Sequence, residues 1–394
     1  MFIKLTSLIA ALLLVPASAL AAPSNAQLRA ALQKDLNAYL AAHAKDEHIS
    51  ALSLSVSLPR EPKNIDLTSG TRNLQGGGSV STSDLWQIGS NTKAFTAAVI
   101  LQLEAEGKLS IDQTIGDWLP QYPAWKNVTI RRLLDMTSGI LGYDNVPAMG
   151  RAFTTIHRRF SDAQLVGFSD PIYPGAPAPT RGYNYSNTNY ILAAMIIERA
   201  TGDTYRAELK RRLLEPLGLT NTFYSPNVYA ASVTNRMVSG YFYNTGPGNE
   251  TFAQFVGKDM RLSDMSWASA AGGIVSTPED VTRWARALYT GDMLASKQRR
   301  ELMTVVSTKT GKPIAATTAS NPEGFGLGVV QATRAPIGTF WFYEGATLGY
   351  RMIHIWLPKS GVICAVGINS QPTKDHAGEL MIAIWRTLHH AGKT

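Results

Sequence analysis

The sequence predicts an α/β (α+β) protein whose antiparallel sheet is built from both ends of the chain and flanked by helices. Three observations lead to this prediction. Strand patterns occur over residues 51–68 and again over residues 326–369, and helical patterns fill most of the segment between them. A helix also precedes the first strands, and another follows the last ones. The middle segment is therefore expected to form an inserted, mostly helical lobe.

The N-terminal elements follow from local signals. Ser24 is a suitable N-cap for an amphipathic helix over residues 24–44. Residues 51–58 alternate between apolar and small polar side chains, which predicts a half-buried strand with one face toward the core. A second short strand is expected at residues 64–68.

The remaining elements are predicted in the same way. Thr277 followed by Pro278 marks a helix start, because it combines an N-cap with a proline at the first helical position, and this helix is expected to reach residue 289. Further helices are expected at residues 92–107, 130–134, 189–200, 205–214 and 377–390. Strands are expected at residues 326–331, 339–343, 350–357 and 362–369.

The first 21 residues have the pattern of a secretory signal peptide. A basic start at Lys4 precedes a short apolar run, and Ala19-Leu20-Ala21 is a small-x-small cleavage site. The apolar run is too short to cross a membrane, and no later stretch is long enough. The mature protein is therefore expected to be periplasmic or secreted by a bacterium, without a membrane span.

The mature chain is expected to contain two lobes. Residues 22–90 and 285–394 would form the α/β sheet domain, and residues 91–284 the mostly helical inserted lobe, with the active site at their interface. The chain has 394 residues, of which 45% are hydrophobic, which is sufficient for a large core. The single cysteine, Cys364, lies in an apolar run and is interpreted as a buried side chain in a strand.

The formal charge of +8 does not indicate a nucleic-acid partner. The basic residues are scattered in pairs and form no stripe, and no nucleic-acid-binding motif is present. The motifs of α/β-hydrolases and of zinc-binding helices with paired histidines are also absent from the sequence. These absences favour a different kind of enzyme or binding protein, acting without a metal or cofactor.

Ser90 and Lys93 form the first candidate for catalysis. Lys93 follows Ser90 by three positions at the predicted start of a helix, so both side chains would lie on one face, one turn apart. A serine hydroxyl needs a base to become a nucleophile, and a buried lysine amine can serve as that base. The alternative is that Ser90 caps the helix and Lys93 is exposed.

Two further segments have side chains suited to catalysis. Tyr185 can relay a proton, and Asn187 can orient both a lysine and a substrate amide. Tyr143-Asp144-Asn145 has the same spacing and is a competing candidate. Residues 343–350 (YEGATLGY) read as a strand edge whose glycines allow a ligand to approach the backbone, although an ordinary hairpin would have the same pattern.

Together these segments resemble the serine β-lactamase and penicillin-binding-protein superfamily. The most similar branch contains class C β-lactamases, D-alanyl-D-alanine carboxypeptidases, D-aminopeptidases and related esterases. The resemblance extends from about residue 51 to the C-terminus and includes four motifs in the family's order. These are residues 86–93 (WQIGSNTK), 133–139 (LLDMTSG), 185–190 (YSNTNY) and 271–277 (AGGIVST). It implies a β-lactamase/transpeptidase-like fold.

The resemblance also implies a role for each matching residue. Ser90 would be the acylated nucleophile and Lys93 its base, alone or together with Tyr185. Asn187 would orient the substrate amide. The oxyanion hole would be formed by the backbone N–H groups of Ser90 and Ala346, next to Gly345.

Tyr343 departs from the family pattern. The family's third motif usually opens with Lys or His, whose charge helps to bind a substrate carboxylate. Arg351 is a candidate replacement for that charge, and both Tyr343 and Arg351 are expected near the substrate. A literal Lys309-Thr310-Gly311 occurs earlier, but it lies in a polar, turn-like stretch.

The sequence therefore predicts a serine hydrolase that acts through an acyl-enzyme. The first choice is a peptidase related to D-alanyl-D-alanine carboxypeptidases and β-lactamases, and the alternative is a carboxylesterase. A third hypothesis is a penicillin-binding or sensing protein without turnover. The expected partner is a small-molecule or peptide substrate, such as a cell-wall peptide or a β-lactam.

Overall fold

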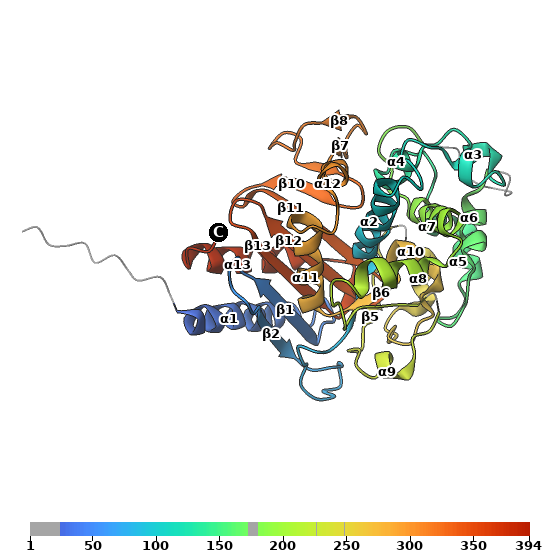
Figure 1. Cartoon of the computed structure of the whole chain (residues 1–394). Coiled ribbons are helices and arrows are strands. Elements are labelled where there is room, and N and C mark those ends of the chain that lie inside the picture. Colours follow the sequence, from blue (N-terminus) through green and yellow to red (C-terminus); the bar gives the residue numbers. More distant parts are fainter. Residues whose placement is uncertain (1–23, 172–179, 226, 248) are drawn as a thin grey trace, which may run out of the picture.

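The structure is a computed structural model that describes residues 24–171, 180–225, 227–247 and 249–394 (Figure 1). The predicted signal peptide lies outside the described residues. Within them, no helix has both the length and the apolar character needed to cross a membrane.

A large antiparallel sheet forms the centre of the molecule, as predicted. Among the described residues it has nine strands in the spatial order β2-β1-β13-β12-β11-β10-β9-β7-β8. Strands from the two ends of the chain pair directly, because β1 lies between β2 and β13. The strands of this sheet are β1 (Ala51–Ser57), β2 (Ile65–Gly70), β7 (Val305–Ser307), β8 (Pro313–Ile314), β9 (Glu323–Phe325), β10 (Val330–Arg334), β11 (Gly338–Ala346), β12 (Arg351–Leu357) and β13 (Val362–Ile368).

Two small sheets join the large one to the rest of the chain. One is antiparallel, in the order β3-β6-β4, and the other is a parallel pair. Their strands are β3 (Trp86–Gln87), β4 (Phe223–Tyr224), β6 (Ile274–Ser276), β5 (Tyr241–Tyr243) and β14 (Ser370–Pro372).

Helices cover both faces of the large sheet, and most of the others gather at one side of it (Figure 1). The α-helices are α1 (Asn25–His43), α2 (Thr92–Ala105), α3 (Ile115–Trp118), α4 (Ile130–Leu134), α5 (Pro147–Ala152), α6 (Asp162–Ser169), α7 (Asn187–Thr201), α8 (Tyr205–Leu209), α9 (Ala231–Thr234), α10 (Ser269–Gly272), α11 (Pro278–Thr290), α12 (Ser296–Leu302) and α13 (Ala377–His390). Short 3-10 helices are η1 (Gly89–Asn91), η2 (Pro123–Trp125), η3 (Tyr143–Asn145), η5 (Glu250–Phe255) and η6 (Met265–Trp267), and η4 (Lys210–Leu214) is a π-helix.

The predicted helix starts are confirmed with their caps. The Ser24 hydroxyl accepts a hydrogen bond from the backbone N–H of Gln27, whose side chain in turn accepts from the backbone of Ser24. Thr277 caps α11 by accepting from the N–H of Asp280, and Pro278 occupies the first helical position. The final helix also has its predicted bounds.

The prediction of a half-buried strand β1 is wrong, because both of its faces are buried. Leu52, Leu54 and Val56 pack in the core beneath α1 and α13, as the alternation indicated. The serines between them lie beneath α11, where the Ser55 hydroxyl is 3.3 Å from that of Thr282. Small side chains on this face allow a helix to pack close to the strand, so a polar residue there does not mean exposure.

Two other predicted elements are divided in the structure. The strand expected at residues 326–331 is interrupted by a turn in which the Gly326 N–H donates to the carbonyl of Val329, so β9 and β10 flank it. The helix expected at residues 205–214 becomes α8 followed by the wider π-helix η4. Because α11 packs on β1 and β13, we propose that the sheet domain resumes at Pro278 rather than at residue 285.

Candidate active site

Ser90 lies in a tight turn between strand β3 and helix α2. The turn is the 3-10 helix η1, and α2 continues directly from it. The end of β11 packs against this turn so closely that a side chain at Gly89 would come within 2.8 Å of the backbone of Ala346. Gly89 also has a φ of +51°, in the left-handed region that favours glycine. The glycine therefore permits both the turn and the close approach of β11.

Lys93 lies one helical turn after Ser90 and is fully buried. Its Nζ is 2.9 Å from the Ser90 Oγ, 2.6 Å from the Asn187 Oδ1 and 2.8 Å from the carbonyl oxygen of Ala271. The alternative of an exposed Lys93 is therefore wrong. Helix α2 is apolar around this residue, and the amine is held by three polar partners.

The partners of Lys93 suit the amine to the role of a base. The oxygens of Asn187 and Ala271 can only accept hydrogen bonds, so they take two N–H groups whichever charge state the amine has. In the neutral amine, the lone pair then faces the hydroxyl of Ser90. This arrangement can remove a proton from Ser90 without moving Lys93.

Tyr185 contacts the same hydroxyl from another side. Its phenol oxygen is 2.7 Å from the Ser90 Oγ and 3.2 Å from the hydroxyl oxygen of Tyr343. Burial raises the pKa of Tyr343 well above its usual range, and the neighbouring Tyr185 acts in the same direction. Tyr343 therefore brings a neutral hydroxyl to the position where the family pattern has a cation.

Asn187 begins helix α7 and joins Lys93 to a buried carboxylate. Its Nδ2 donates to the Asp144 Oδ2 at 2.8 Å, which fixes the amide so that its oxygen faces Lys93. Burial raises the pKa of Asp144, while the hydrogen bond from Asn187 acts in the opposite direction. The competing Tyr143-Asp144-Asn145 segment thus lies beside the site instead of replacing Tyr185 and Asn187.

Gly345 and Ala346 lie at the end of β11, against the Ser90 turn. A side chain at Gly345 would come within 2.1 Å of the carbonyl oxygen of Ile88. Ala346 lines the same small cavity as Ser90, Tyr143 and Asn187. A larger cavity, of about 730 Å³, lies between α8 and β4 and contains none of these residues. Ser90, Asn187 and Ala346 therefore line the small cavity, and the other sequence-predicted residues lie around Ser90, with one exception.

Arg351 is the exception, and the expectation that it replaces the missing cation at the substrate is wrong. Its guanidinium is fully buried. The Nη2 is 2.5 Å from a Glu47 oxygen, the Nη1 is 2.5 Å from Asp375, and the Nε donates to the carbonyl of Ser370. Every nitrogen of this side chain is occupied by a partner in the fold, so none is left for a substrate.

Three contributors to the site were missed in the sequence: Asp144, the carbonyl of Ala271, and the pair Asn91 and His354. Asn91 donates to the carbonyls of Ile88 and Met352, and its oxygen accepts from the Nδ1 of His354 at 2.6 Å. This pair ties the Ser90 turn to β12. Asp144 lies in the competing tyrosine motif, and Asn91 and Ala271 lie in two of the family motifs, so only His354 had no such signal.

His354 is buried in the core, and this burial lowers the pKa of its imidazole to about 3. Two other positions agree with the predictions. Cys364 is buried in β13, which raises the pKa of its thiol to about 12. Lys309 lies exposed in the turn between β7 and β8, with its amine on the carbonyl of Ser320.

Comparisons with known proteins identify the family. The β-lactamase family model matches residues 36–386. Penicillin-binding protein 4* of Bacillus subtilis is 26% identical over 279 residues, which is 70% of this chain and 58% of that protein. Penicillin-binding protein 4 of Amycolatopsis lactamdurans is 29% identical over 248 residues, or 61% of this chain and 60% of that protein. The chain thus spans less than two thirds of these relatives.

Two of the similar solved structures match over nearly their whole length. A D-stereospecific amidohydrolase from a Streptomyces species has a TM-score of 0.74 at 25% identity, with 91% of this chain and 98% of that chain covered. The D-amino acid amidase from Ochrobactrum anthropi SV3, in complex with L-phenylalanine, has a TM-score of 0.78 at 24% identity, with 92% and 99% covered. The chain therefore belongs to the β-lactamase family of serine hydrolases, as the resemblance in its sequence predicted.

Proposed function

We propose that this protein hydrolyses amides or peptides of D-amino acids through an acyl-enzyme on Ser90. The observation that carries the proposal is the pair of contacts on the Ser90 hydroxyl, 2.9 Å from the Lys93 amine and 2.7 Å from the Tyr185 phenol. The similar amidohydrolase and amidase structures suggest the substrate class.

The geometry suggests a sequence of proton transfers. Neutral Lys93 takes the proton of Ser90 as its oxygen bonds to the substrate carbonyl carbon. The backbone N–H groups of Ser90 and Ala346 stabilise the resulting oxyanion. The bond to the leaving nitrogen then breaks as Tyr185 delivers a proton to that nitrogen, and the proton held by Lys93 passes back to Tyr185, which leaves Lys93 neutral again. Water next attacks the acyl carbon and gives its proton to the neutral Lys93, which returns it to the Ser90 oxygen as the ester bond breaks.

Tyr343 limits which leaving groups are expected to bind at the site. A substrate such as D-alanyl-D-alanine carries a free carboxylate, and binding it without a cation costs desolvation that a neutral phenol compensates weakly. We therefore propose a peptidase that is related to D-alanyl-D-alanine carboxypeptidases but differs from them in preferring substrates whose leaving group is uncharged. Cell-wall peptides and β-lactams remain candidate ligands under this proposal.

A carboxylesterase is the second candidate, and a specific observation favours it. The hydroxyl of Tyr343 lies 3.2 Å from that of Tyr185, where the family pattern has a cation, and an ester whose alcohol group is uncharged does not need that cation. Turnover of a short p-nitrophenyl ester, with no cleavage of any D-amino-acid amide, would favour the esterase.

Intact-mass detection of covalent adducts tests the proposal. The wild type would be incubated with a penicillin, a D-alanyl-D-alanine peptide, D-phenylalanine amide and a short ester. We expect an acyl adduct with at least one of them in the wild type and in a Ser83→Ala control, whose serine is exposed. Ser90→Ala should give none, and equal labelling of this variant would refute the proposal.

Product release separates hydrolysis from mere binding. An adduct that accumulates without any free product would support the third hypothesis, a penicillin-binding or sensing protein. We expect instead that D-phenylalanine is released in many turnovers. Export to the periplasm or medium, by the predicted signal peptide, is part of the same proposal, and the mass of the mature protein would test it.

A further inference from the structure

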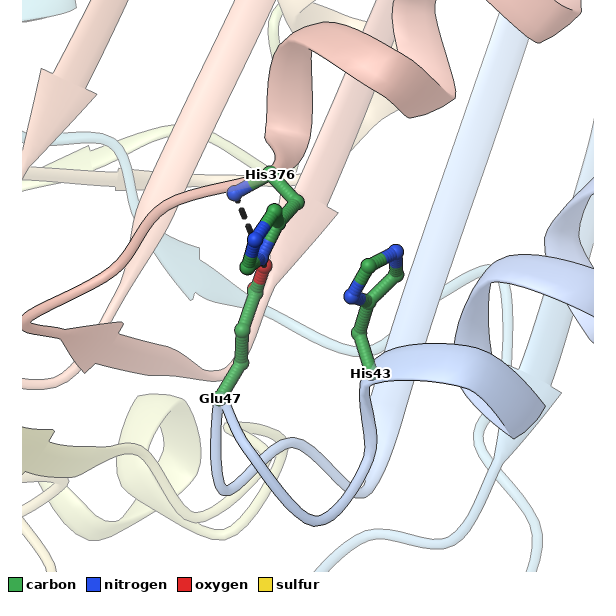
Figure 2. Close-up of side chains that lie close together, drawn as sticks. All are labelled: His43, Glu47 and His376. Atoms are coloured by element: carbon green, nitrogen blue, oxygen red, sulfur yellow. Dashed lines mark hydrogen bonds and ion pairs between the residues drawn. The ribbon is translucent and has the colours of Figure 1, made fainter.

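His43, Glu47 and His376 form a cluster where the two ends of the chain meet. His43 is the last residue of α1, Glu47 lies in the turn after it, and His376 immediately precedes α13. Figure 2 shows the three side chains converging from these segments. One nitrogen or oxygen from each lies within 4.8 Å of the others. Two imidazoles and a carboxylate are a common ligand set for Zn²⁺.

Glu47 is already held in place for such a role. Its carboxylate is fully buried and accepts from the hydroxyl of Tyr39 at 2.9 and 3.0 Å. The backbone N–H and the Nδ1 of His376 are both 2.8 Å from its Oε1, and Arg351 binds its Oε2. The carboxylate is thus fixed by the fold and directs one oxygen toward the histidines.

The carboxylates around the cluster outnumber the arginine side chains, which favours binding of a divalent cation. Glu47 and Asp375 both contact Arg351, and Glu379 is 3.4 Å from the Nε2 of His43. Two carboxylates therefore share one guanidinium, and a third, from the exposed Glu379, lies beside His43. A bound cation would neutralise the excess negative charge. The histidine side chains are only 17% and 30% exposed, so a bound ion would be partly shielded from water.

We propose that this cluster is a zinc-type divalent metal site that ties α1 to α13. The ligands would be the Oε1 of Glu47 and one ring nitrogen from each of His43 and His376. The ion would replace the proton through which His376 now binds Glu47. Bond lengths near 2 Å would separate neighbouring ligand atoms by about 3.3 Å. The two imidazole rings are stacked with their centroids 4.4 Å apart, so at least one ring would turn about its side-chain bonds when the ion binds. Glu379 or water would complete the tetrahedron.

The site would have a structural role, separate from the hydrolysis proposed at Ser90. It departs from the expectation, drawn from the sequence, that the protein binds no metal. The reason is that the two histidines lie 333 positions apart in the chain and show no ligand spacing. A metal that binds only the folded state would raise its stability by mass action.

Titration of the chelator-treated, full-length protein with Zn²⁺ tests the site. We expect one Zn²⁺ to bind per chain and the unfolding temperature to rise. His43→Gln and His376→Gln should each bind at least about tenfold more weakly, as expected when a ligand is lost. The double variant His389→Gln/His390→Gln removes a histidine pair outside the cluster and should bind like the wild type.

Co²⁺ provides a measurement that does not depend on the variants folding. A tetrahedral nitrogen–oxygen site should give intense visible absorption bands with the wild type, and these bands should vanish when Zn²⁺ is added. Absence of the bands and of Zn²⁺ binding in the wild type would overturn the proposal. It would also be overturned if both cluster variants bound Zn²⁺ as tightly as the control.

Discussion

Two buried polar networks lie beside the same pair of strands and differ in how completely their groups are paired. One surrounds Ser90 beside the end of β11, and the other surrounds Arg351 at the start of β12. Ala346 and Arg351 are even direct partners in the register of the two strands. Position in the fold therefore does not decide which network can act on a substrate.

The two networks differ in whether any of their hydrogen-bonding groups remain free to bind a substrate. Each nitrogen of Arg351 has a partner within the fold. Around Ser90, by contrast, the hydroxyl is partly exposed and borders a cavity, and the Oδ1 of Asp144 is buried without a hydrogen-bond partner among the described residues. A network that is complete stabilises the fold, whereas an incomplete one has capacity to bind and react. Mutations should therefore affect activity in one network and stability in the other.

Apart from loss of the Ser90 nucleophile itself, the largest effect on activity is expected for Lys93→Met. Loss of a positioned base should slow acylation of Ser90 by on the order of 10³-fold, while the long apolar side chain keeps the buried space filled. The rate at which the short ester or D-phenylalanine amide acylates Ser90 would be measured in quenched, timed reactions. Lys309→Met, in an exposed turn, should react like the wild type. Retention of wild-type rates by Lys93→Met would remove Lys93 from the mechanism.

Arg351→Met should produce the opposite pattern. Removing one partner of a buried ion pair leaves Glu47 uncompensated, and we expect the free energy of unfolding to fall by about 3–5 kcal/mol. Urea unfolding would measure it. Arg334→Met breaks an ion pair with Glu323 whose arginine is 54% exposed, and should cost less than about 1 kcal/mol. A similar loss in both variants would contradict the contrast between the two networks.

His354 links the two networks, because its uncharged ring ties the Ser90 turn to β12, the strand that also carries Arg351. Its Nδ1–H donates to Asn91 and its Nε2 accepts from the hydroxyl of Tyr289, which requires the neutral ring. Burial lowers its pKa from 6.5 to about 3 in the folded state. The unfolded chain therefore takes up the proton first as the pH falls.

Protonation of His354 makes the folded protein less stable at low pH. The contribution of His354 to stability is fully present above pH 6.5 and is lost as the pH falls toward 3, by on the order of 5 kcal/mol. His354→Gln should lower stability at pH 7.5 but flatten its dependence on pH between 6.5 and 4. Urea unfolding at several pH values would show this. If the free energy of unfolding of His354→Gln depended on pH as in the wild type, His354 would not be the cause of the acid sensitivity. His157→Gln, at an exposed position, serves as the control.

Local and periodic signals predicted most of the fold and the catalytic candidates. The caps of α1 and α11 depend on neighbouring residues, and so does the spacing of Ser90 and Lys93, so each can be read from a short segment. Burial of the serine face of β1 could not be predicted, because it depends on α11, more than 200 residues later.

The errors about Arg351 and Asp144 have the same physical origin. Side chains along β12 alternate between the two faces of the sheet, but the sequence of β12 does not say what covers each face. The Arg351 side chain binds Glu47, which lies on a segment from the other end of the chain. Asp144 reaches Asn187 only once η3 packs beside α7. Contacts between distant segments decide whether a charged residue serves the fold or the site.

The smallest expected effect tests the substrate side of the Ser90 network. Tyr343→Lys would restore a cation at the position where the family pattern has one. We expect the ratio of kcat/KM for a D-alanyl-D-alanine peptide to kcat/KM for its C-terminal amide to rise about tenfold, since a charge-assisted hydrogen bond to a carboxylate contributes about 1.5–3 kcal/mol before the cost of burying the lysine. Tyr343→Phe, which removes the hydroxyl without adding charge, should leave this ratio unchanged although both rates fall. If the lysine variant also kept the wild-type ratio, a carboxylate would not be bound next to Tyr343, and the preference for an uncharged leaving group would need another cause.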